Sequence, residues 1–346
     1  MMSYLEKNLS YNTTNNLSSC DLPTELVGVS ATMLILATVL GTLSNIFIIG
    51  VFIWERSLRT PVHSLMFTLA IVDFIHCAVH TTSLLLRILG SSWITPDVHT
   101  SICKVAFTCS TFTNMENVLL IGALSIARYT QVSKHHQIHF KSVLLYIAFT
   151  VILEICFVTY TVFYPVLMTG VCTCSEQDRD YSLHNNWVPI IFLCMFTVCG
   201  IIMLVYYLKL LQLIKLHRSA IASLIIHTNK LDRSVFRSMR LLTINFIITY
   251  LPLAILIPIL ISGPLSQTVY ENWVLYGGFA LNSLGHAVDP LIYGLYSSHF
   301  RKAFKKCCLP LWRKCTILGK HNQVSTINMA SSVADISFPL GNQVQS

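Results

Sequence analysis

The chain has 346 residues, of which 54% are hydrophobic and only 11% are charged, and its formal net charge is +8. This composition excludes an ordinary soluble domain, in which about 25% of residues are charged. It predicts a membrane protein with several spans. The Lys and Arg residues lie between apolar runs, which indicates membrane topology and not a nucleic-acid partner.

The N-terminal segment, residues 1–25, is polar and contains three Asn-x-Ser/Thr sequons, at Asn8, Asn12 and Asn16. No other sequon occurs in the sequence. Three sequons confined to one polar terminus predict that this terminus is extracellular and glycosylated. Because no signal peptide is visible, we expect the first apolar segment to direct membrane insertion.

Seven apolar segments follow, each long enough to cross a bilayer as a helix. An odd number of spans places the two termini on opposite sides of the membrane. With the N-terminus outside, 19 of the 23 Lys and Arg residues face the cytosol (23 less the four at Lys7, Arg87, Lys104 and Arg179), as the positive-inside rule requires. The segments lie at roughly 26–54, 61–89, 100–132, 142–168, 187–216, 235–262 and 272–296.

The third segment has an unusually polar interior for a membrane span. Between Cys103 and Arg128 it carries one acidic residue, Glu116, and several hydroxyl and amide side chains at successive turns. In hydrocarbon such groups must face other helices or a wet cavity. We therefore expect this helix at the centre of a bundle, with Glu116 hydrogen-bonded to a neighbouring helix.

The C-terminal region divides into two parts. Residues 297–309 space aromatic residues four apart among Lys and Arg, which predicts a short amphipathic helix on the membrane surface. Cys307 and Cys308 at its end are candidates for palmitoylation, with reduced cytosolic thiols as the alternative. Residues 310–346 are polar, and we expect a disordered cytoplasmic tail.

Only four of the twelve cysteines meet the oxidising side in this topology, namely Cys20, Cys103, Cys172 and Cys174. Cys103, at the outer end of the third span, is well placed to pair with Cys172 or Cys174. The remaining loop cysteine could then pair with Cys20. The connectivity stays open, because spacing alone does not determine it.

These features resemble the rhodopsin-like (class A) G protein-coupled receptors over nearly the whole chain. Each motif alone is weakly specific, but all of them in order are strongly specific. The resemblance implies an all-α membrane protein, a bundle of seven transmembrane helices with the short surface helix, located in the plasma membrane. The motifs are Gly41 and Asn45 in GxxxN, Asp73 ending LAIVD, Arg128-Tyr129, Phe246 and Pro252 in FIITYLP, and Asp289 to Tyr293 in DPLIY.

The resemblance also implies a ligand site in the outer half of the bundle. Ser110 stands where amine receptors carry a carboxylate, and Ser283 stands where opsins carry the retinal-binding Lys. We therefore expect a peptide, or a lipid-like or small neutral ligand, and no covalent retinal. The family positions for ligand contact are Ser110, Thr111, Asn114, Met195, Leu253, Ile257, Phe279 and Asn282.

For activation, the resemblance implies that Arg128 pairs with Asp232 until the sixth helix swings. Pro252 removes a backbone hydrogen bond within that helix and gives it a place to bend. The acidic residue that usually precedes the arginine is Ala127 here, which should weaken the restraint on Arg128. Further coupling and activation positions are Tyr129, Phe246, Tyr250, Asp289, Pro290 and Tyr293.

The family's sodium ion implies a candidate metal site at Asp73, Asn117 and Asp289. Carboxylates at membrane depth require pairing, hydration or a bound ion. The neighbours expected around Asp73 depart from the family, because the usual Ser, Trp, Asn and Ser are replaced. A satisfied polar core without an ion is therefore an equal alternative. The replacing residues are Asn117, Tyr250, Gly285 and His286.

Other functional classes have less support. The sequence contains no Walker loop, no His-Glu-x-x-His pair and no GxSxG motif, so we do not expect an enzyme. An ion or solute transporter is disfavoured because no inverted repeat is visible. Ala127 keeps open a receptor that scavenges ligand or recruits arrestin without activating a G protein. The expected partners are an extracellular ligand, a heterotrimeric G protein, arrestin, receptor kinases and membrane lipids.

Overall fold

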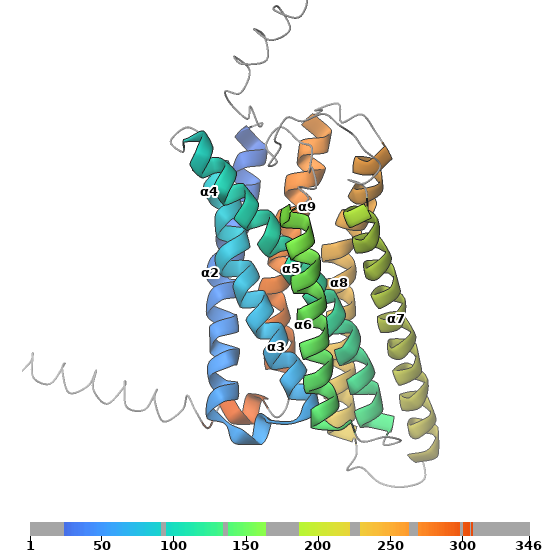
Figure 1. Ribbon diagram of the computed structural model, residues 1–346. Coiled ribbons are helices and arrows are strands. Elements are labelled where there is room, and N and C mark those ends of the chain that lie inside the picture. The colour runs from blue at the N-terminus through green and yellow to red at the C-terminus, as the bar shows by residue number, and fades with distance from the viewer. Residues whose placement is uncertain are drawn as a thin grey trace, which may run out of the picture.

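The structure is a computed structural model that describes residues 24–90, 95–133, 138–163, 187–221, 229–262, 269–297, 300–304 and 306. Seven helical spans run side by side through the molecule (Figure 1). Within the described ranges the chain is helical apart from short connections, so the predicted all-α bundle is confirmed. The spans are α2 (Thr24–Trp54), α3 with η2 and α4 (Pro61–Ile75, His76–Thr81, Thr82–Gly90), α5 (Pro96–Ser133), α6 (Phe140–Phe163), α7 (Trp187–Ile221), α8 (Asn229–Ser262) and α9 (Val269–Tyr296).

The helices turn apolar side chains outward and polar side chains inward. Leu43 on α2, Leu145 on α6 and Ile152 on α6 are among the most exposed large hydrophobic residues, whereas Asp73, Glu116 and Asn117 are buried. This distribution is the one that hydrocarbon surroundings favour. By length and composition, five described helical segments could each cross a membrane, and neither α5 nor α9 is among them. The five are Thr24–Trp54, Pro61–Leu86, Phe140–Thr159, Leu193–Leu213 and Arg237–Ile255.

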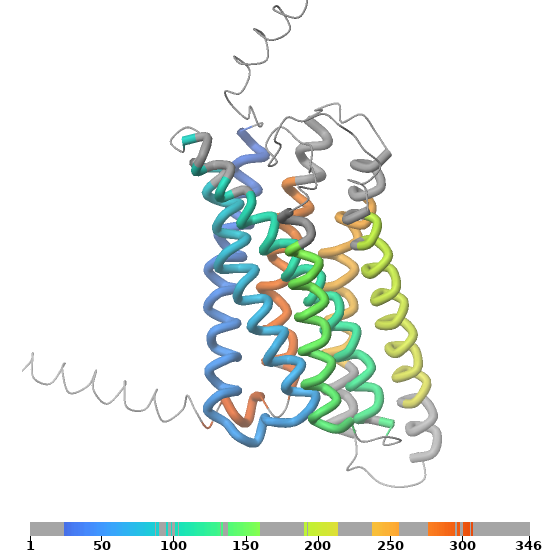
Figure 2. The backbone as a smooth tube through the Cα atoms, viewed as in Figure 1, coloured from blue at the N-terminus to red at the C-terminus, as the bar shows by residue number. Residues whose placement is uncertain are grey.

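Helix α5 lies at the centre of the bundle, as its polar sequence predicts. It packs against the second span and against α6, α7 and α8. The first and last spans are also neighbours, because α2 packs along α9 (Figure 2). Side chains from widely separated parts of the sequence therefore meet around α5.

The second span begins and bends in ways that local sequence explains only in part. Its start is capped by Thr60, whose hydroxyl accepts a hydrogen bond from the His63 backbone N–H, and Pro61 occupies the first helical turn. Its middle contains the π-helical turn η2, which the sequence did not predict. Such turns occur mostly within α-helices at functional sites. Here the turn places both His76 and His80 in the interior.

The last described residues pack beneath the first span. Residues 300–304 are helical, and Phe300 is buried while Phe304 is exposed and meets Phe47 edge-on at 5.2 Å between ring centroids. Lys306 Nζ lies 2.8 Å from Glu55 Oε2. The hydrogen bonds from Lys306 and Ser57 lower the pKa of the Glu55 carboxyl. This contact should therefore persist at neutral pH and weaken only as the pH falls through that lowered pKa.

Gly41 on α2 allows the first span to approach the second and the last. A Cβ atom at this position would overlap Cys77 Sγ and would lie 3.0 Å from Cys77 Cβ and 3.1 Å from Ala287 Cβ. We expect Gly41→Leu to destabilise the helix bundle by about 1–3 kcal/mol, because a close-packed interface cannot accommodate added atoms. Surface expression and the apparent Tm of the purified protein measure the effect.

Gly50→Leu is the matched control for this substitution. Gly50 lies on the same helix, and nothing lies within 4 Å of a Cβ atom placed there. We expect this variant to behave like the native chain, since its side chain would point toward lipid. Equal losses from the two variants would contradict the proposed role of Gly41.

Candidate functional site

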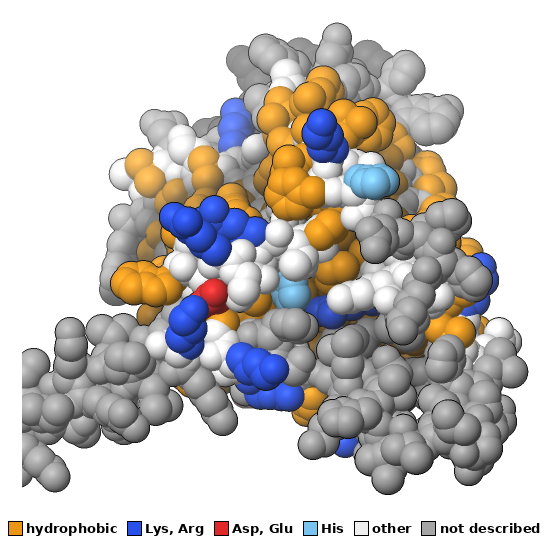
Figure 3. Space-filling model, turned by 90° about the horizontal axis from the view of Figure 1, so that it is seen from below, with side chains coloured by type: hydrophobic (Ala, Val, Ile, Leu, Met, Phe, Trp, Pro, Cys, Tyr) orange, Lys and Arg blue, Asp and Glu red, His pale blue; other side chains and the backbone are white. Residues whose placement is uncertain are grey.

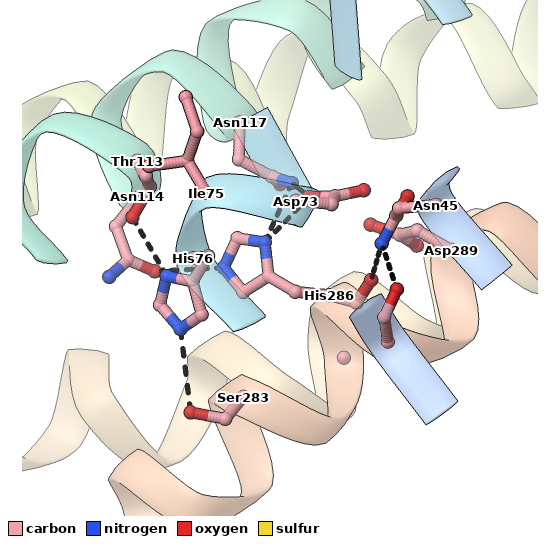
Figure 4. A network of polar contacts seen from close by, with 12 residues as sticks. Asn45, Asp73, Ile75, His76, Thr113, Asn114, Asn117, Ser283, His286 and Asp289 are labelled. Carbon is pink, nitrogen blue, oxygen red and sulfur yellow. Dashed lines mark hydrogen bonds and ion pairs between the residues drawn. The ribbon is translucent and has the colours of Figure 1, made fainter. Parts of the chain in front are cut away.

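The candidate site is a buried polar network centred on Asp73 of α3 (Figure 4). Asp73 Oδ1 lies 2.6 Å from His286 Nδ1 on α9 and accepts a hydrogen bond of 2.7 Å from Asn117 Nδ2 on α5. Asn117 Oδ1 in turn accepts a hydrogen bond of 3.1 Å from the Tyr250 hydroxyl on α8. One connected set of side chains thus joins the second, third, sixth and seventh spans.

A second buried carboxylate, Asp289, lies on α9 one turn beyond His286. Asn245 Nδ2 on α8 donates to Asp289 Oδ1 at 2.8 Å and to the Gly285 carbonyl at 3.2 Å. Gly285 makes this approach of α8 possible, because a Cβ atom there would clash with Thr249. The sixth and seventh spans are therefore linked both by hydrogen bonds and by close packing.

Three histidine side chains form a row beside Asp73. The rings of His76 and His286 stack with their centroids 3.8 Å apart and 19° between their planes, and His80 lies 4.6 Å from His76. His76 also contacts Thr113 on α5 and Ser283 on α9 through its two ring nitrogens. The sequence interpretation missed His76 and His80, although two histidines within one apolar span were a visible signal.

The predicted ligand-binding residues fall into three groups. Ser110, Asn114 and Asn282 lie beside the network, and Asn114 Nδ2 donates to the Ser110 carbonyl at 2.9 Å. Phe279 is 6.4 Å from His80 between ring centroids, and Leu253 packs near Gly278. Thr111 and Met195 are partly buried, whereas the side chain of Ile257 lies outside the described residues.

Asn282 is the most unusual of these positions. Its side chain is buried, yet within the described part of the chain neither of its polar atoms makes a hydrogen bond of ordinary geometry. The Tyr250 side chain lies close enough to interact with this amide. A buried amide with incomplete hydrogen bonding is destabilising, and a polar ligand group at this position would complete it.

At the inner end of α5, Arg128 is buried at 6% exposure beside Ala127 at 2%. Arg128 Nη2 donates to Met66 Sδ on α3 at 3.1 Å, and a thioether is only a weak acceptor. The side chain of Asp232, the expected partner, lies outside the described residues. Tyr129 meets Tyr206 of α7 edge-on at 5.5 Å.

The remaining activation positions lie in the interior of the bundle. Phe246 stacks on Phe196 at 4.9 Å and contacts Tyr250 at 5.0 Å between centroids. Tyr293 is fully buried. Pro252 lies within α8, and Pro290 lies within α9.

Glu116 is also paired across helices, as expected for an acidic group in hydrocarbon. Thr150 on α6 donates to Glu116 Oε1 at 3.0 Å. Glu154, on the same helix one turn further, lies beside Glu116. This second polar cluster is separate from the network around Asp73, and it joins the third span to the fourth.

The end of the bundle that carries η1 (Arg56–Leu58) is basic (Figure 3). Lys and Arg side chains gather on this face, in keeping with the orientation predicted from charge. The exposed described residues of this kind are Arg56, Arg59, Lys141, Arg237, Arg240, Arg301, Lys302 and Lys306.

Several predicted modification sites fall outside the described part of the chain. They are the sequons at Asn8, Asn12 and Asn16, the cysteines Cys20, Cys172 and Cys174, and the palmitoylation candidates Cys307 and Cys308. Cys103 lies within α5, but its side chain is not described.

The candidate sodium site is only partly compatible with this geometry. The two side chains that face Asp73 Oδ1, Asn117 and His286, present nitrogen atoms to it. A hard cation prefers oxygen ligands, and the Asn117 oxygen already accepts from Tyr250. The donor set at Asp73 Oδ1 therefore does not fit a cation.

Comparison with known proteins gives a consistent result. Residues 44–293 match the family model described as "7 transmembrane receptor (rhodopsin family)". The chain is 22% identical to melanocortin receptor 5 of Rattus norvegicus over 333 residues, covering 90% of this chain and 94% of that receptor. It is 23% identical to melatonin receptor type 1A of Mus musculus over 303 residues, covering 84% and 82%. The crystal structure of squid rhodopsin matches with a TM-score of 0.66 and 18% identity, covering 85% of this chain and 88% of that one.

Proposed function

Because the chain belongs to the rhodopsin family of seven-transmembrane receptors, we propose that it binds an extracellular ligand and activates a heterotrimeric G protein. Like its relatives, the chain is a receptor and not an enzyme. The observation that carries the proposal is the continuous network from Asn114 through His286, Asp73 and Asn117 to Tyr250. This network connects the outer polar region with α8, the helix whose movement would open the inner face.

The proposed ligand is a peptide or a small neutral molecule with hydrogen-bonding groups. Ser110 provides no carboxylate for an amine, and its backbone carbonyl and hydroxyl both accept from Asn114 Nδ2. The buried amide of Asn282 supplies one donor group and one acceptor atom for a ligand. A screen that includes melanocortin peptides and melatonin, the ligands in the names of two relatives, is the direct test.

The proposed mechanism is a shift in population between two states. A ligand that contacts Asn282 or Asn114 would favour a state with a rearranged network, because it binds the two arrangements with different affinity. In that state α8 moves away at its inner end and Arg128 leaves Met66. The opened inner face would then accept a G protein.

We also propose that the receptor sits in the plasma membrane with its N-terminus outside and its C-terminus in the cytosol. The charge distribution along the chain and the basic inner face support this orientation. The proposal includes glycosylation at Asn8, Asn12 and Asn16, a disulfide from Cys103 and palmitoylation at Cys307 and Cys308. Cell-surface labelling of an N-terminal tag in unpermeabilised cells would test the orientation.

Ala127 motivates a prediction about basal signalling. We expect the native chain to signal more without ligand than Ala127→Asp does, because a carboxylate beside Arg128 would pair with it and stabilise the inactive state. A charge pair of this kind contributes up to about 1 kcal/mol when it is exposed. Nucleotide exchange at matched surface expression is the measurement. Equal or lower basal activity of the native chain would contradict the prediction.

The same residue supports a second candidate function. A receptor that lacks the usual acidic neighbour of Arg128 could scavenge ligand or recruit arrestin without activating a G protein. Parallel assays of nucleotide exchange and arrestin recruitment separate the two functions. Arrestin recruitment without exchange on any Gα subunit would favour the second.

A further inference from the structure

Asp73 is a buried carboxylate that requires a positive partner. It lies in the middle of a membrane span with no exposed surface, and a second carboxylate, Asp289, lies in the same region. A charged group at this depth is costly unless another charge or several hydrogen bonds stabilise it. What occupies the position next to Asp73 therefore determines how this part of the bundle is held together.

The position next to Asp73 Oδ1 is taken by the His286 ring. Its Nδ1 atom lies 2.6 Å from Asp73 Oδ1, and Asn117 Nδ2 donates to the same oxygen from 2.7 Å. Asn117 Nδ2 and His286 Nδ1 are 3.2 Å apart, because both converge on one acceptor. Two N–H groups directed at one carboxylate oxygen present their positive ends to it, and a cation would be repelled from the same place.

The hydrogen-bond partners of His286 place a proton between its ring and Asp73. Nε2 lies 3.3 Å from Asn114 Oδ1. The orientation of that amide follows from its other end, since Asn114 Nδ2 donates to the Ser110 backbone carbonyl, which can only accept. Nε2 therefore carries hydrogen. Nδ1 donates to an ionised Asp73 or accepts from a protonated one, and in both forms Asp73 Oδ1 is already hydrogen-bonded on this side.

The neighbouring side chains hold the His286 ring in this place. The His76 ring stacks on it at 3.8 Å. His76 is itself fixed by Thr113 Oγ1 at 2.7 Å, and by Ser283 Oγ at 3.4 Å. The Thr113 hydroxyl donates to the Cys109 carbonyl, so it accepts from His76 Nδ1, and His76 Nε2 can then accept from Ser283. The stacked and hydrogen-bonded His76 ring thus restricts the position of the His286 ring.

We propose that the His286 side chain occupies the position beside Asp73 Oδ1 that a sodium ion would need and that it excludes sodium from this carboxylate. The α9 helix would then be tied to α3 by a covalently attached side chain, which cannot dissociate as an ion can. Rearrangement of the network would require movement of the His286 side chain. A ligand group that competes for Asn114 Oδ1 would act directly on that side chain.

The opposite side of Asp73 provides the alternative that a test must distinguish. Asp73 Oδ2 and Asn45 Oδ1 are buried oxygens without a hydrogen bond of ordinary geometry among the described residues. The Tyr293 hydroxyl is close enough to Asp73 to interact with it electrostatically. Sodium bound through Asp73 Oδ2 would leave the His286 contact intact and would contradict the proposal.

The test measures the apparent Tm of the purified full-length receptor in NaCl and in KCl of equal ionic strength. The readout requires no ligand and no G protein, so it is independent of the proposed signalling function. We expect the native chain to melt at the same temperature in both salts. His286→Ser, which restores the residue usual in the family, should gain stability in NaCl alone. A gain of roughly 2–4 °C corresponds to sodium at ten times its Kd.

Two further variants locate the ion. In the double variant His286→Ser with Asp73→Asn, the gain in NaCl should disappear, because the carboxylate is the ligand. If His286→Ser folds but shows no response to sodium, His286 is not what excludes the ion and the proposal fails. If His286→Ser does not fold, the Tm of the native chain in the two salts tests the proposal. A sodium-specific rise in its Tm that Asp73→Asn abolishes would overturn the proposal, and equal Tm values in the two salts would support it.

Discussion

Replacing Arg128 by alanine is expected to abolish G protein activation, with basal and ligand-stimulated nucleotide exchange falling at least about tenfold. The reason is that Arg128 is the buried cation at the inner end of α5, and its recorded hydrogen bond goes to a weak acceptor, Met66 Sδ, at 3.1 Å. The free-energy cost of breaking the Arg128–Met66 contact is small, since a thioether is a weaker acceptor than water or a carbonyl. Under the proposed mechanism, the guanidinium is therefore available to a G protein once α8 moves. A panel of Gα biosensors at matched surface expression measures the loss.

Arg59→Ala is the matched control for this experiment. Arg59 is an exposed arginine on the same inner face, and its guanidinium lies 3.5 Å from the Ile53 carbonyl. We expect it to retain most of the native signal. Full activity of Arg128→Ala would refute the role assigned to this arginine. A native chain that is silent on every Gα subunit and still recruits arrestin would replace the G protein proposal with the second candidate function.

Removing one partner of the Asp73–His286 pair is expected to be strongly destabilising. His286→Leu leaves Asp73 with a single donor, Asn117, and breaking a buried pair from one side costs about 3–5 kcal/mol. Asp73→Leu leaves His286 Nδ1 without its partner in the same way. Replacing both residues by leucine should cost less than the sum of the two single changes, because neither member of the pair is then left buried without the other. The apparent Tm of the purified receptor should fall on the order of 10 °C in each single variant.

Asn282→Leu provides the control on the same helix. Asn282 is equally buried, but its amide makes no hydrogen bond of ordinary geometry among the described residues. We expect its replacement to change the Tm little, since no hydrogen bond of ordinary geometry is lost. Additive costs in the leucine double variant of Asp73 and His286 would show that the two side chains do not act as a pair.

The spans were accessible from sequence because a bilayer imposes a local requirement. A helix of about 20 apolar residues is needed to cross it, and five of the described helical segments meet that requirement by themselves. The more polar α5 and α9 were predicted from their length and from the motif order. The first predicted span, 26–54, corresponds to α2, Thr24–Trp54, and the fourth, 142–168, corresponds to α6, Phe140–Phe163, within a few residues. The π-helical turn at His76–Thr81 was not predictable in this way. The backbone hydrogen bonds of this π-helical turn span one more residue than those of an α-helix. The turn leaves the apolar pattern of the segment unchanged.

The candidate site was predictable as a set of residues and not as an arrangement. Asp73, Asn117, Tyr250 and His286 were all expected near one another from the motif order. His286 and Asp73 lie 213 positions apart in the chain. The contact between His286 Nδ1 and Asp73 Oδ1 depends on how α3 and α9 are rotated about their axes. Close approaches at Gly41 and Gly285 set those rotations, and they involve residues from other spans.

By itself, the sequence determined the number of spans, the central place of the third helix and the receptor family, because apolar length and ordered motifs are properties of single segments. Only the tertiary structure decided which partner each buried polar group has. In hydrocarbon every such group must find a partner inside the bundle. Several pairings satisfy that need on paper, and the packing of the helices selects the one in which a histidine, stacked on a second histidine, contacts the central aspartate.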